Sequence, residues 1–338
     1  MIKQPFDLKN FNTFGFAAKS PAGAVISSLE ELHTAISYAK SKQMPLLTIG
    51  GGSNIVLQDD LSRFALVIRI PGIDLLQEES DHVLIRVGAG VEWDELVQYS
   101  LNQKWYGLEN LSIIPGTVGA CPIQNVGAYG VEIKDFFHEL TALEISSLKE
   151  HVLSKEDCCF SYRDSIFKNE YRDRFIITAV TLKLRKNPIV NLSFPNLRKE
   201  LTHLPEDKIT PEDVRHAVIS IRTRRLPDVK QIGNAGSFFM NPIVDESLFH
   251  DVYKQYPDLL FTALDNQQYK ISASWLIERC GWKGFQEKAV GVFEENPLVL
   301  VHRGGGTAGD LLELSKKIIQ SVYDTFGITL KMEPRLYS

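Results

Sequence analysis

The segment Pro45-Leu46-Leu47-Thr48-Ile49-Gly50-Gly51-Gly52-Ser53-Asn54 decides the fold class of this chain. A short apolar run that ends in consecutive glycines is typical of a buried β-strand that leads into a turn. Backbone amides that no side chain covers allow a pyrophosphate to approach closely and to accept several hydrogen bonds. The turn therefore suggests phosphate binding, although such a motif, taken alone, is more often an ordinary tight turn. It is neither a P-loop nor a Rossmann fingerprint, because the required lysine and glycine spacings are missing.

The residues on both sides of this turn alternate between helical and strand patterns. Residues 28–43 place apolar side chains on one helical face, and Ser28 and Glu31 form a capping-box pattern at the start. Thr210 is expected to cap another helix that begins at Pro211. Further elements are expected as strands at residues 66–70, 83–87 and 175–184, the last with the alternating pattern of a strand, and as a helix at residues 93–101. This alternation predicts a mixed α and β protein.

The bulk composition is that of a globular protein of two or three domains. The chain has 338 residues, of which 44% are hydrophobic and 23% are charged. Its longest apolar stretches, at residues 65–70 and 297–301, are far shorter than the roughly 20 residues that span a bilayer. The first 16 residues mix charged and polar side chains and do not resemble a secretory signal. We therefore expect a cytoplasmic protein that does not bind membranes.

Charge and cysteine content exclude further classes. The formal net charge of -5 argues against a nucleic-acid partner, which normally requires a basic surface. The four cysteines have neither a metal-ligand spacing nor the density of a disulfide scaffold, and we expect reduced thiols, mostly buried, and no metal: Cys121, Cys158, Cys159 and Cys280.

A second glycine-rich segment lies at residues 114–130. It contains four glycines and two prolines, more than a purely structural loop usually needs. Our hypothesis is that this segment and the turn at residues 50–54 hold one extended dinucleotide from two sides. The motif Gly88-Ala89-Gly90 also lies between a strand and a helix, but Trp93 stands where a dinucleotide fingerprint requires its third glycine. We interpret that motif as unrelated to nucleotide binding.

Two segments concentrate cationic groups. Arg163 lies among hydrogen-bonding and aromatic residues at positions 161–168, where a surface salt bridge is an equally good explanation. Residues 222–230 form the only dense basic run in this acidic chain. A solvated helix end accounts for that run, but it also suits a nucleotide diphosphate, because arginine pairs with phosphate oxygens two at a time.

Two further segments carry groups able to move a proton. Ser237 follows two glycines and precedes two phenylalanines at residues 233–242, so its hydroxyl is a candidate proton donor or a helix cap. Glu333 lies in a short strand-like run at residues 330–335. A solvated carboxylate on a frayed terminus is the simpler interpretation of Glu333 from these residues alone.

Taken in order, these motifs resemble the UDP-N-acetylenolpyruvoylglucosamine reductases, the MurB family. The resemblance runs over nearly the full length, from Asn12-Thr13-Phe14-Gly15 to Glu333-Pro334-Arg335, and the string at residues 162–168 is similar to the type I branch. The most specific motifs are Gly51-Gly52-Ser53-Asn54, Ile114-Pro115-Gly116, Pro122-Ile123-Gln124-Asn125, Gly127-Ala128-Tyr129-Gly130, Tyr162-Arg163-Asp164-Ser165 and Gly233-Asn234-Ala235-Gly236-Ser237-Phe238-Phe239.

The resemblance implies an α+β fold with a two-part FAD-binding region of the vanillyl-alcohol-oxidase (PCMH) type plus a C-terminal α+β substrate-binding domain. We expect FAD-binding subdomains at residues 1–70 and 71–209, a substrate-binding domain at residues 210–329, and a C-terminal segment, residues 330–338, that returns to the active site. The implied enzyme is a monomer that holds FAD without a covalent link. It uses NADPH to reduce UDP-N-acetylglucosamine enolpyruvate to UDP-N-acetylmuramate, and the two substrates take turns in one site.

The resemblance also implies residue roles. Arg163 and Glu333 are expected to bind and polarise the enolpyruvyl carboxylate, and Ser237 to donate the proton that quenches the carbanion or enol. The expected FAD contacts are Gly50, Gly51, Gly52, Ser53, Asn54, Ile114, Pro115, Gly116, Gly119, Gln124, Asn125, Gly127, Ala128, Gly130 and Arg335. The expected substrate contacts are Tyr129, Tyr162, Phe194, Arg222, Arg225, Asn241 and Asn296.

The chain departs from the family pattern at several substrate positions. Phe194 stands where the pattern has a tyrosine, so the ring is kept and the hydroxyl is lost. Arg225 replaces a lysine and keeps the charge, whereas Met240 replaces a lysine and does not. The usual histidine near residues 293–297 is absent, and Asn296 is the remaining candidate for the uracil or a phosphate.

Two other functions are compatible with parts of the sequence. A flavin-dependent oxidase of the same broad fold would often tether FAD through a histidine or cysteine, so release of the flavin by acid distinguishes it. A non-catalytic nucleotide-binding protein would not need Arg163, Ser237 and Glu333 together.

Overall fold

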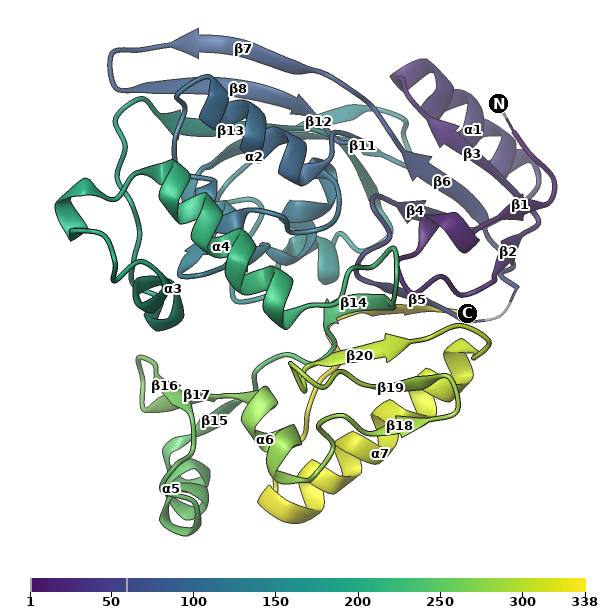
Figure 1. The fold of residues 1–338 in the computed structure, drawn as a ribbon. Coiled ribbons are helices and arrows are strands. Elements are labelled where there is room, and N and C mark those ends of the chain that lie inside the picture. Colours follow the sequence, from purple (N-terminus) through teal and green to yellow (C-terminus); the bar gives the residue numbers. More distant parts are fainter. Residues whose placement is uncertain (1, 59) are drawn as a thin grey trace. The chain divides into compact units, whose positions relative to one another are not determined.

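The computed structural model describes residues 2–58 and 60–338, which divide into two compact units that the chain enters more than once (Figure 1). Unit 1 comprises the chain up to Phe6, Ser20–Gly52 and Ser62–Thr223. Unit 2 comprises Asp7–Lys19, Ser53–Leu61 and Arg224–Ser338. The short strands β1 (Phe6–Asp7) and β2 (Lys19–Ser20) form a two-stranded sheet. Because one segment of unit 1 ends at Gly52 and a segment of unit 2 begins at Ser53, the glycine turn at residues 50–54 is divided between the units.

Unit 1 contains a small parallel sheet. Its strands β3 (Ala22–Ile26), β6 (Phe64–Ile68) and β4 (Leu46–Ile49) are arranged in that order, and every residue of the central strand is buried. Helix α1 (Leu29–Ser41) packs beside β3 (Figure 1). The helix confirms the prediction for residues 28–43, and the Ser28 hydroxyl accepts from the Glu31 amide at 3.2 Å. The Glu31 carboxylate, however, accepts from the Ser27 amide at 2.7 Å, so the predicted capping box is only half formed.

A five-stranded antiparallel sheet forms the rest of the unit 1 framework. Its strand order is β12 (Glu150–Ser154), β11 (Phe137–Glu144), β13 (Phe175–Arg185), β8 (His82–Gly88) and β7 (Ile73–Glu78). The predicted strands at residues 83–87 and 175–184 are confirmed. The central strand β13 does not show the expected alternation, because Ile176 to Leu182 are all buried and the 3₁₀ helix η3 (Val118–Gln124) packs against it.

Unit 1 contains three further helices, the last of which continues into unit 2 at Arg224. They are α2 (Trp93–Asn102), α3 (Pro195–Glu200) and α4 (Pro211–Arg225). The Thr210 hydroxyl accepts from the Asp213 amide at 3.1 Å, which confirms the predicted cap of α4. One face of α4, including Val214, Val218 and Ile221, forms a small core with Leu192 and Leu197. The long helix α4 is thus fixed to unit 1 along its apolar face.

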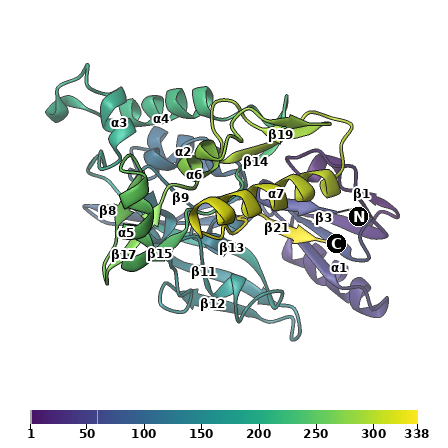
Figure 2. The ribbon, with the colours of Figure 1, turned by 90° about the horizontal axis from the view of Figure 1, so that it is seen from below.

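Unit 2 is built around a four-stranded antiparallel sheet. Its order is β14 (Gly233–Ser237), β20 (Val299–His302), β19 (Val290–Val292) and β18 (Gln286–Glu287), and helix α7 (Ala308–Phe326) lies along it (Figure 2). A second sheet contains β15 (Ile243–Asp245), β17 (Gln268–Ile271) and β16 (Phe261–Ala263), with helices α5 (Glu246–Gln255) and α6 (Ala273–Arg279) nearby in the sequence. The last strand, β21 (Arg335–Tyr337), pairs in parallel with β5 (Ile55–Leu57).

The expectation of reduced thiols is met in the described part of the chain, although only two of the four cysteines are buried. All four cysteines are free thiols, and Cys121 and Cys158 are buried. Burial raises the pKa of the Cys158 thiol to about 12, so it stays protonated and unreactive at neutral pH. Among the described residues, no helix is both long and apolar enough to cross a membrane.

Candidate active site

The two glycine-rich segments meet within unit 1. A Cβ atom on Gly51 would lie 2.5 Å from the Gly116 Cα, and a Cβ on Gly50 would lie 2.5 Å from the Thr117 hydroxyl oxygen. Gly116 also has a φ of +125°, which other residues rarely adopt. The glycines at these positions are therefore required by the approach of one loop to the other. The structure brings the segments together, as expected of two loops that hold one ligand.

A polar atom at this junction is unsatisfied by the protein. Thr117 is 1% exposed, and its hydroxyl has no hydrogen-bond partner among the described residues. A buried hydroxyl without a partner costs free energy, so an unpaired donor beside two glycine loops fits a bound phosphate or flavin oxygen. Arg69 donates to the Gly50 carbonyl at 3.0 Å and fixes the first loop. The residues present thus fit a dinucleotide such as FAD.

The Gly88-Ala89-Gly90 motif has a packing role. A Cβ on Gly88 would lie 2.3 Å from the Pro71 carbonyl oxygen, and a Cβ on Gly90 would lie 2.2 Å from the Arg69 Cα. Both glycines therefore make room for the chain that leaves β6. The structure accounts for this motif without any nucleotide.

The second half of the long glycine segment forms a tight hairpin in unit 1. Strands β9 (Gly127–Ala128) and β10 (Val131–Glu132) are joined by Tyr129 and Gly130, which have φ values of +51° and +83°. Two consecutive positive φ values are typical of a type I′ hairpin turn. The turn fixes the position of the Tyr129 ring.

Asn125 supports this hairpin from inside. It is fully buried, and its amide nitrogen donates to the Glu132 carboxylate at 2.8 Å and to the Ser161 carbonyl at 3.0 Å. Both hydrogens of the side-chain amide are therefore engaged within the protein. Any contact of Asn125 with a cofactor would involve other atoms of the residue.

Arg163 lies on a tight turn that is attached to the glycine segment. Ser161 and Asp164 bond to each other through their backbones, and Arg163 between them has a φ of +54°. Its guanidinium donates to the Gly127 carbonyl at 2.8 Å. The Ser165 hydroxyl donates to the Ile123 carbonyl at 2.6 Å and holds the same two segments together. The candidate catalytic arginine is thus fixed beside the candidate cofactor loop.

Three of the predicted substrate residues cluster in unit 1. The Tyr129 and Phe194 rings meet edge to face, with centroids 5.2 Å apart, and Tyr129 accepts a hydrogen bond from Arg222. The Arg222 Nε is buried and has no hydrogen-bond partner among the described residues. Burial, together with the positive charge of Arg163, lowers the pKa of Arg222, although Tyr129 and Asp94 act in the opposite direction. Two arginines close enough to affect each other provide a site for an anion.

Ser237 ends strand β14 in unit 2 at an irregular point of the sheet. The register between β14 and β20 shifts between Asn234 and Ser237, and Gly236 has a φ of +66°. The Asn234 side chain, which is buried, accepts from the Gly236 amide at 3.0 Å. Thr13 donates to the Asn234 carbonyl at 2.6 Å, which explains why the motif at residues 12–15 accompanies the serine motif. The bulge ends the regular pairing where the Ser237 side chain begins.

The C-terminal segment runs beside the serine motif in the same unit. The Glu333 amide donates to the Phe238 carbonyl at 2.9 Å, and the Met240 amide donates to the Lys331 carbonyl at the same distance. Glu333 is therefore held next to the residue that follows Ser237. Two residues later, the Arg335 amide donates to the Asn54 carbonyl at 3.0 Å. The terminus is paired with the protein here rather than frayed.

The remaining substrate candidates have local partners. The Asn241 side chain accepts from the Ala273 amide at 2.9 Å and so fixes the start of α6. Asn296 is 9% exposed, and its side chain accepts from the Leu298 amide at 3.2 Å. The Tyr162 ring contacts the Arg163 guanidinium, whose carbon lies 5.6 Å from the ring centroid. Arg225 is the exposed last residue of α4.

Sequence reasoning did not identify Thr117 or Arg69 as part of the glycine junction. Thr117 stands between Gly116 and Gly119, and a hydroxyl inside a glycine-rich loop is a signal that could have singled it out. Arg69 gives no such signal, because its contact with Gly50 depends on the pairing of β4 with β6.

Comparison with known proteins supports one family. A model described as the C-terminal domain of UDP-N-acetylenolpyruvoylglucosamine reductase matches residues 227–337, and a model of an FAD binding domain matches residues 22–147. A protein named UDP-N-acetylenolpyruvoylglucosamine reductase from Pseudomonas fluorescens is 42% identical over 336 residues, covering 99% of both chains. One of the same name from Cupriavidus pinatubonensis is 43% identical over 331 residues, covering 97% of both.

Solved structures show a related fold. The crystal structure of UDP-N-acetylenolpyruvylglucosamine reductase (MurB) from Thermus caldophilus is similar, with a TM-score of 0.71 at 22% identity over the whole of both chains. A 6-hydroxy-D-nicotine oxidase from Arthrobacter nicotinovorans has a TM-score of 0.55 at 13% identity, covering 97% of this chain and 86% of that one. These similarities confirm the predicted α+β fold, and the FAD-binding part of the prediction is supported by the FAD binding domain model over residues 22–147.

Proposed function

Because this chain belongs to the UDP-N-acetylenolpyruvoylglucosamine reductase family, we propose that it reduces UDP-N-acetylglucosamine enolpyruvate to UDP-N-acetylmuramate with FAD and NADPH. This reaction supplies a precursor of peptidoglycan. The observation that best supports the proposal at the level of residues is the pairing of the C-terminal segment with the serine motif, in which Glu333 is bonded to Phe238, the residue after Ser237. A binding protein that had lost its activity would not need that arrangement.

FAD is assigned to the glycine junction of unit 1. The loops at residues 50–52 and 114–119 approach each other there, and the unpaired Thr117 hydroxyl gives a donor for the cofactor. When bound, FAD supplies the redox chemistry and carries a hydride equivalent from NADPH to the vinyl carbon of the substrate. By the family resemblance, the further FAD contacts are assigned to Ser53, Asn54, Gln124, Asn125, Gly127, Ala128, Gly130 and Arg335.

The protein's own groups make the vinyl carbon reactive. Hydride addition leaves negative charge that must be drawn toward the substrate carboxylate, so cationic and hydrogen-bonding groups are required there. We assign that role to Arg163 and Glu333. By the family resemblance, Ser237 is assigned as the donor of the proton to the substrate carbon that bears the carboxylate. Its backbone is fixed at the end of a bulged strand.

The diphosphate and sugar are assigned to the arginines of α4. The Nε of Arg222 is buried and has no hydrogen-bond partner among the described residues, and Arg225 follows three residues later at the helix end. Tyr129 and Phe194 provide an aromatic wall, and Tyr162, Asn241 and Asn296 are assigned as further contacts. The division into FAD-binding residues 1–70 and 71–209, substrate-binding residues 210–329 and C-terminal residues 330–338 is part of this proposal. So are a monomeric state and a cytoplasmic location.

The proposal is tested with the purified protein. We expect a yellow protein with about one FAD per chain that acid releases, because the junction at Gly51 and Gly116 binds FAD without a covalent link. NADPH oxidation is expected to depend on the enolpyruvyl sugar nucleotide and to yield UDP-N-acetylmuramate by mass spectrometry. A colourless protein, or a flavoprotein that oxidises NADPH without consuming the sugar nucleotide, would contradict the proposal.

Phe194→Tyr is expected to be tolerated and to tighten substrate binding. The Phe194 ring is 37% exposed and touches Tyr129 only edge to face, so an added hydroxyl does not crowd a core. One new hydrogen bond stabilises a complex by about 1 kcal/mol, which corresponds to a several-fold lower KM for the sugar nucleotide. Steady-state kinetics measure this change, with Phe261→Tyr at a similarly exposed ring of unit 2 as the control. A severe loss of activity would show that Phe194 packs differently in the working enzyme.

A further inference from the structure

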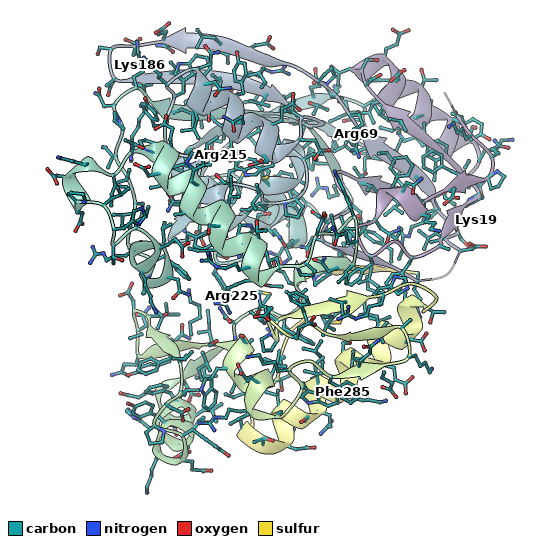
Figure 3. All side chains as sticks on the ribbon, viewed as in Figure 1. Lys19, Arg69, Lys186, Arg215, Arg225 and Phe285 are labelled. Carbon is teal, nitrogen blue, oxygen red and sulfur yellow. The ribbon has the colours of Figure 1, made fainter. Side chains whose placement is uncertain are left out.

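The carboxylate of Asp94 joins three segments of unit 1. Asp94 lies in the first turn of α2, and its Oδ1 accepts from the Ile113 amide at 2.7 Å. The same carboxylate accepts from both terminal nitrogens of Arg215 on α4, at 2.7 and 2.9 Å. The third guanidinium nitrogen of Arg215 donates to Gln98 at 3.2 Å. Arg215, labelled on α4 in Figure 3, is thus bonded to α2 through all three guanidinium nitrogens.

On one side, Asp94 holds the start of a cofactor loop. Ile113 has a φ of +48°, which is unusual for a β-branched residue and costs free energy unless its surroundings enforce it. It precedes Ile114-Pro115-Gly116, and the Gly116 carbonyl accepts from the Trp93 amide at 2.9 Å. We call residues 113–117 the flavin loop. The first two residues of α2 therefore fix both ends of this loop.

On the other side, Asp94 holds the helix that carries Arg222. Arg215 is 8% exposed and lies seven residues before Arg222, which places the two arginines on the same face of α4. The charge of Asp94 also acts on Arg222. Burial alone would raise the pKa of Asp94, but the hydrogen bonds from Arg215 and Ile113 and the charges of Arg215 and Arg222 outweigh it and lower this pKa. Asp94 is therefore ionised at neutral pH.

Stability alone does not explain this partly buried pair, in which the side chain of Arg215 is 10% exposed and that of Asp94 is 34% exposed. Replacing a buried ion pair with well-packed apolar side chains is often neutral or stabilising, because desolvation offsets the attraction. A bidentate pair does restrict geometry, since the planar guanidinium fixes both the distance and the rotation of the helix that carries it. What the pair fixes here is the placement of α4 against the flavin loop.

We propose that Asp94 and Arg215 form a positioning latch that sets the register between the flavin loop and the substrate-binding arginine Arg222. This inference rests on the proposed function, which assigns FAD to the flavin loop and the sugar nucleotide to Arg222. Neither residue touches a reacting atom. Loss of the latch moves Arg222 relative to the flavin loop. It weakens binding of the sugar nucleotide without changing the chemical groups in the site.

Two substitutions separate the two arms of the latch, which are the contact of Asp94 with Arg215 on α4 and the contact of Asp94 with the Ile113 amide. Arg215→Met removes the α4 arm and keeps the Asp94 contact with Ile113, so we expect FAD binding to be unchanged and KM for the sugar nucleotide to rise about tenfold, a usual size for coupling between linked sites. Asp94→Ala removes both arms, so FAD dissociation should quicken as well. Arg215→Lys keeps the charge without the bidentate geometry and should recover only part of the KM. Glu95→Gln, on an exposed residue of the same turn, is the control and should match the unaltered enzyme.

The readouts are FAD dissociation followed by flavin fluorescence, KM and kcat separately, and hydrogen exchange of the Ile113 amide. Faster exchange at Ile113 in Asp94→Ala but not in Arg215→Met supports the latch and does not depend on activity. If Arg215→Met lowers thermal stability but leaves KM unchanged, the pair is only structural and the latch is wrong. If Arg215→Met does not fold because Asp94 is left unpaired, Asp94→Asn/Arg215→Met removes that charge and is expected to show the same raised KM. An unaltered enzyme without FAD or NADPH oxidation would instead contradict the proposed function, while the exchange measurement would still decide on the latch.

Discussion

Replacing Ser237 with alanine is expected to slow the oxidation of reduced enzyme by the enolpyruvyl sugar nucleotide by several orders of magnitude. The same change should leave flavin reduction by NADPH nearly intact. Only the first of these half-reactions develops negative charge on the substrate carbon that Ser237 protonates, so only it loses a general acid. Stopped-flow absorbance of the flavin measures the two steps separately.

The structure indicates that this substitution will not disturb the fold. Ser237 is half-buried at the end of β14, and the turn before it is held by the Asn234 side chain and by the positive φ of Gly236. None of these contacts uses the serine hydroxyl. Ser237→Cys should recover part of the rate, because a thiol is the stronger acid at a similar reach.

A serine with a structural role supplies the control for this experiment. The Ser272 hydroxyl caps α6 by accepting from the Trp275 amide, so Ser272→Ala should cost about 1 kcal/mol of stability and slow neither half-reaction. If Ser237→Ala slowed both half-reactions equally, Ser237 would support the cofactor or the fold. If it slowed neither, another group would be the acid.

The local elements of the fold could be predicted from the sequence. Ser28 and the apolar face behind it defined α1, and Thr210 defined the start of α4, because caps and helical periodicity act over a few residues. The alternation expected for β13 was wrong, since burial on both faces depends on η3 and on the neighbouring strands. The sequence around a strand does not contain that information.

The contacts that assemble the candidate site could not be predicted, because they join distant segments. The bond from Asn125 to Ser161 and the ion pair between Asp94 and Arg215 leave no local pattern. The same holds for the parallel pairing of β21 with β5, which follows no hairpin or crossover of adjacent strands. The glycines are an intermediate case. Their density predicted a close approach, and the structure shows that the approach at Gly51 is to Gly116.

The second large effect is expected at Arg163. Arg163→Met should slow the oxidative half-reaction roughly 10²–10³-fold, the usual cost of losing one preorganised group that stabilises developing charge. Its guanidinium is oriented by the bond to the Gly127 carbonyl and by the tight turn between Ser161 and Asp164, so the charge is in place before substrate binds. Arg163→Lys keeps a positive charge without the planar donors, so its rate should lie between those of Arg163→Met and the unaltered enzyme. Single-turnover kinetics with pre-reduced enzyme measure the step.

The matched control is Arg174→Met. Arg174 is about half exposed and pairs with Glu144 at 3.5 Å, and such surface pairs contribute little, so its loss should leave both half-reactions unchanged. Flavin content and the rate of flavin reduction by NADPH should also be unchanged in Arg163→Met, because the turn keeps its backbone bonds between Ser161 and Asp164. Equal slowing of both half-reactions, or loss of flavin, would mean that Arg163 acts through its bond to Gly127 as a support for the cofactor loop. Selective slowing of the oxidative step would place its charge at the substrate carboxylate.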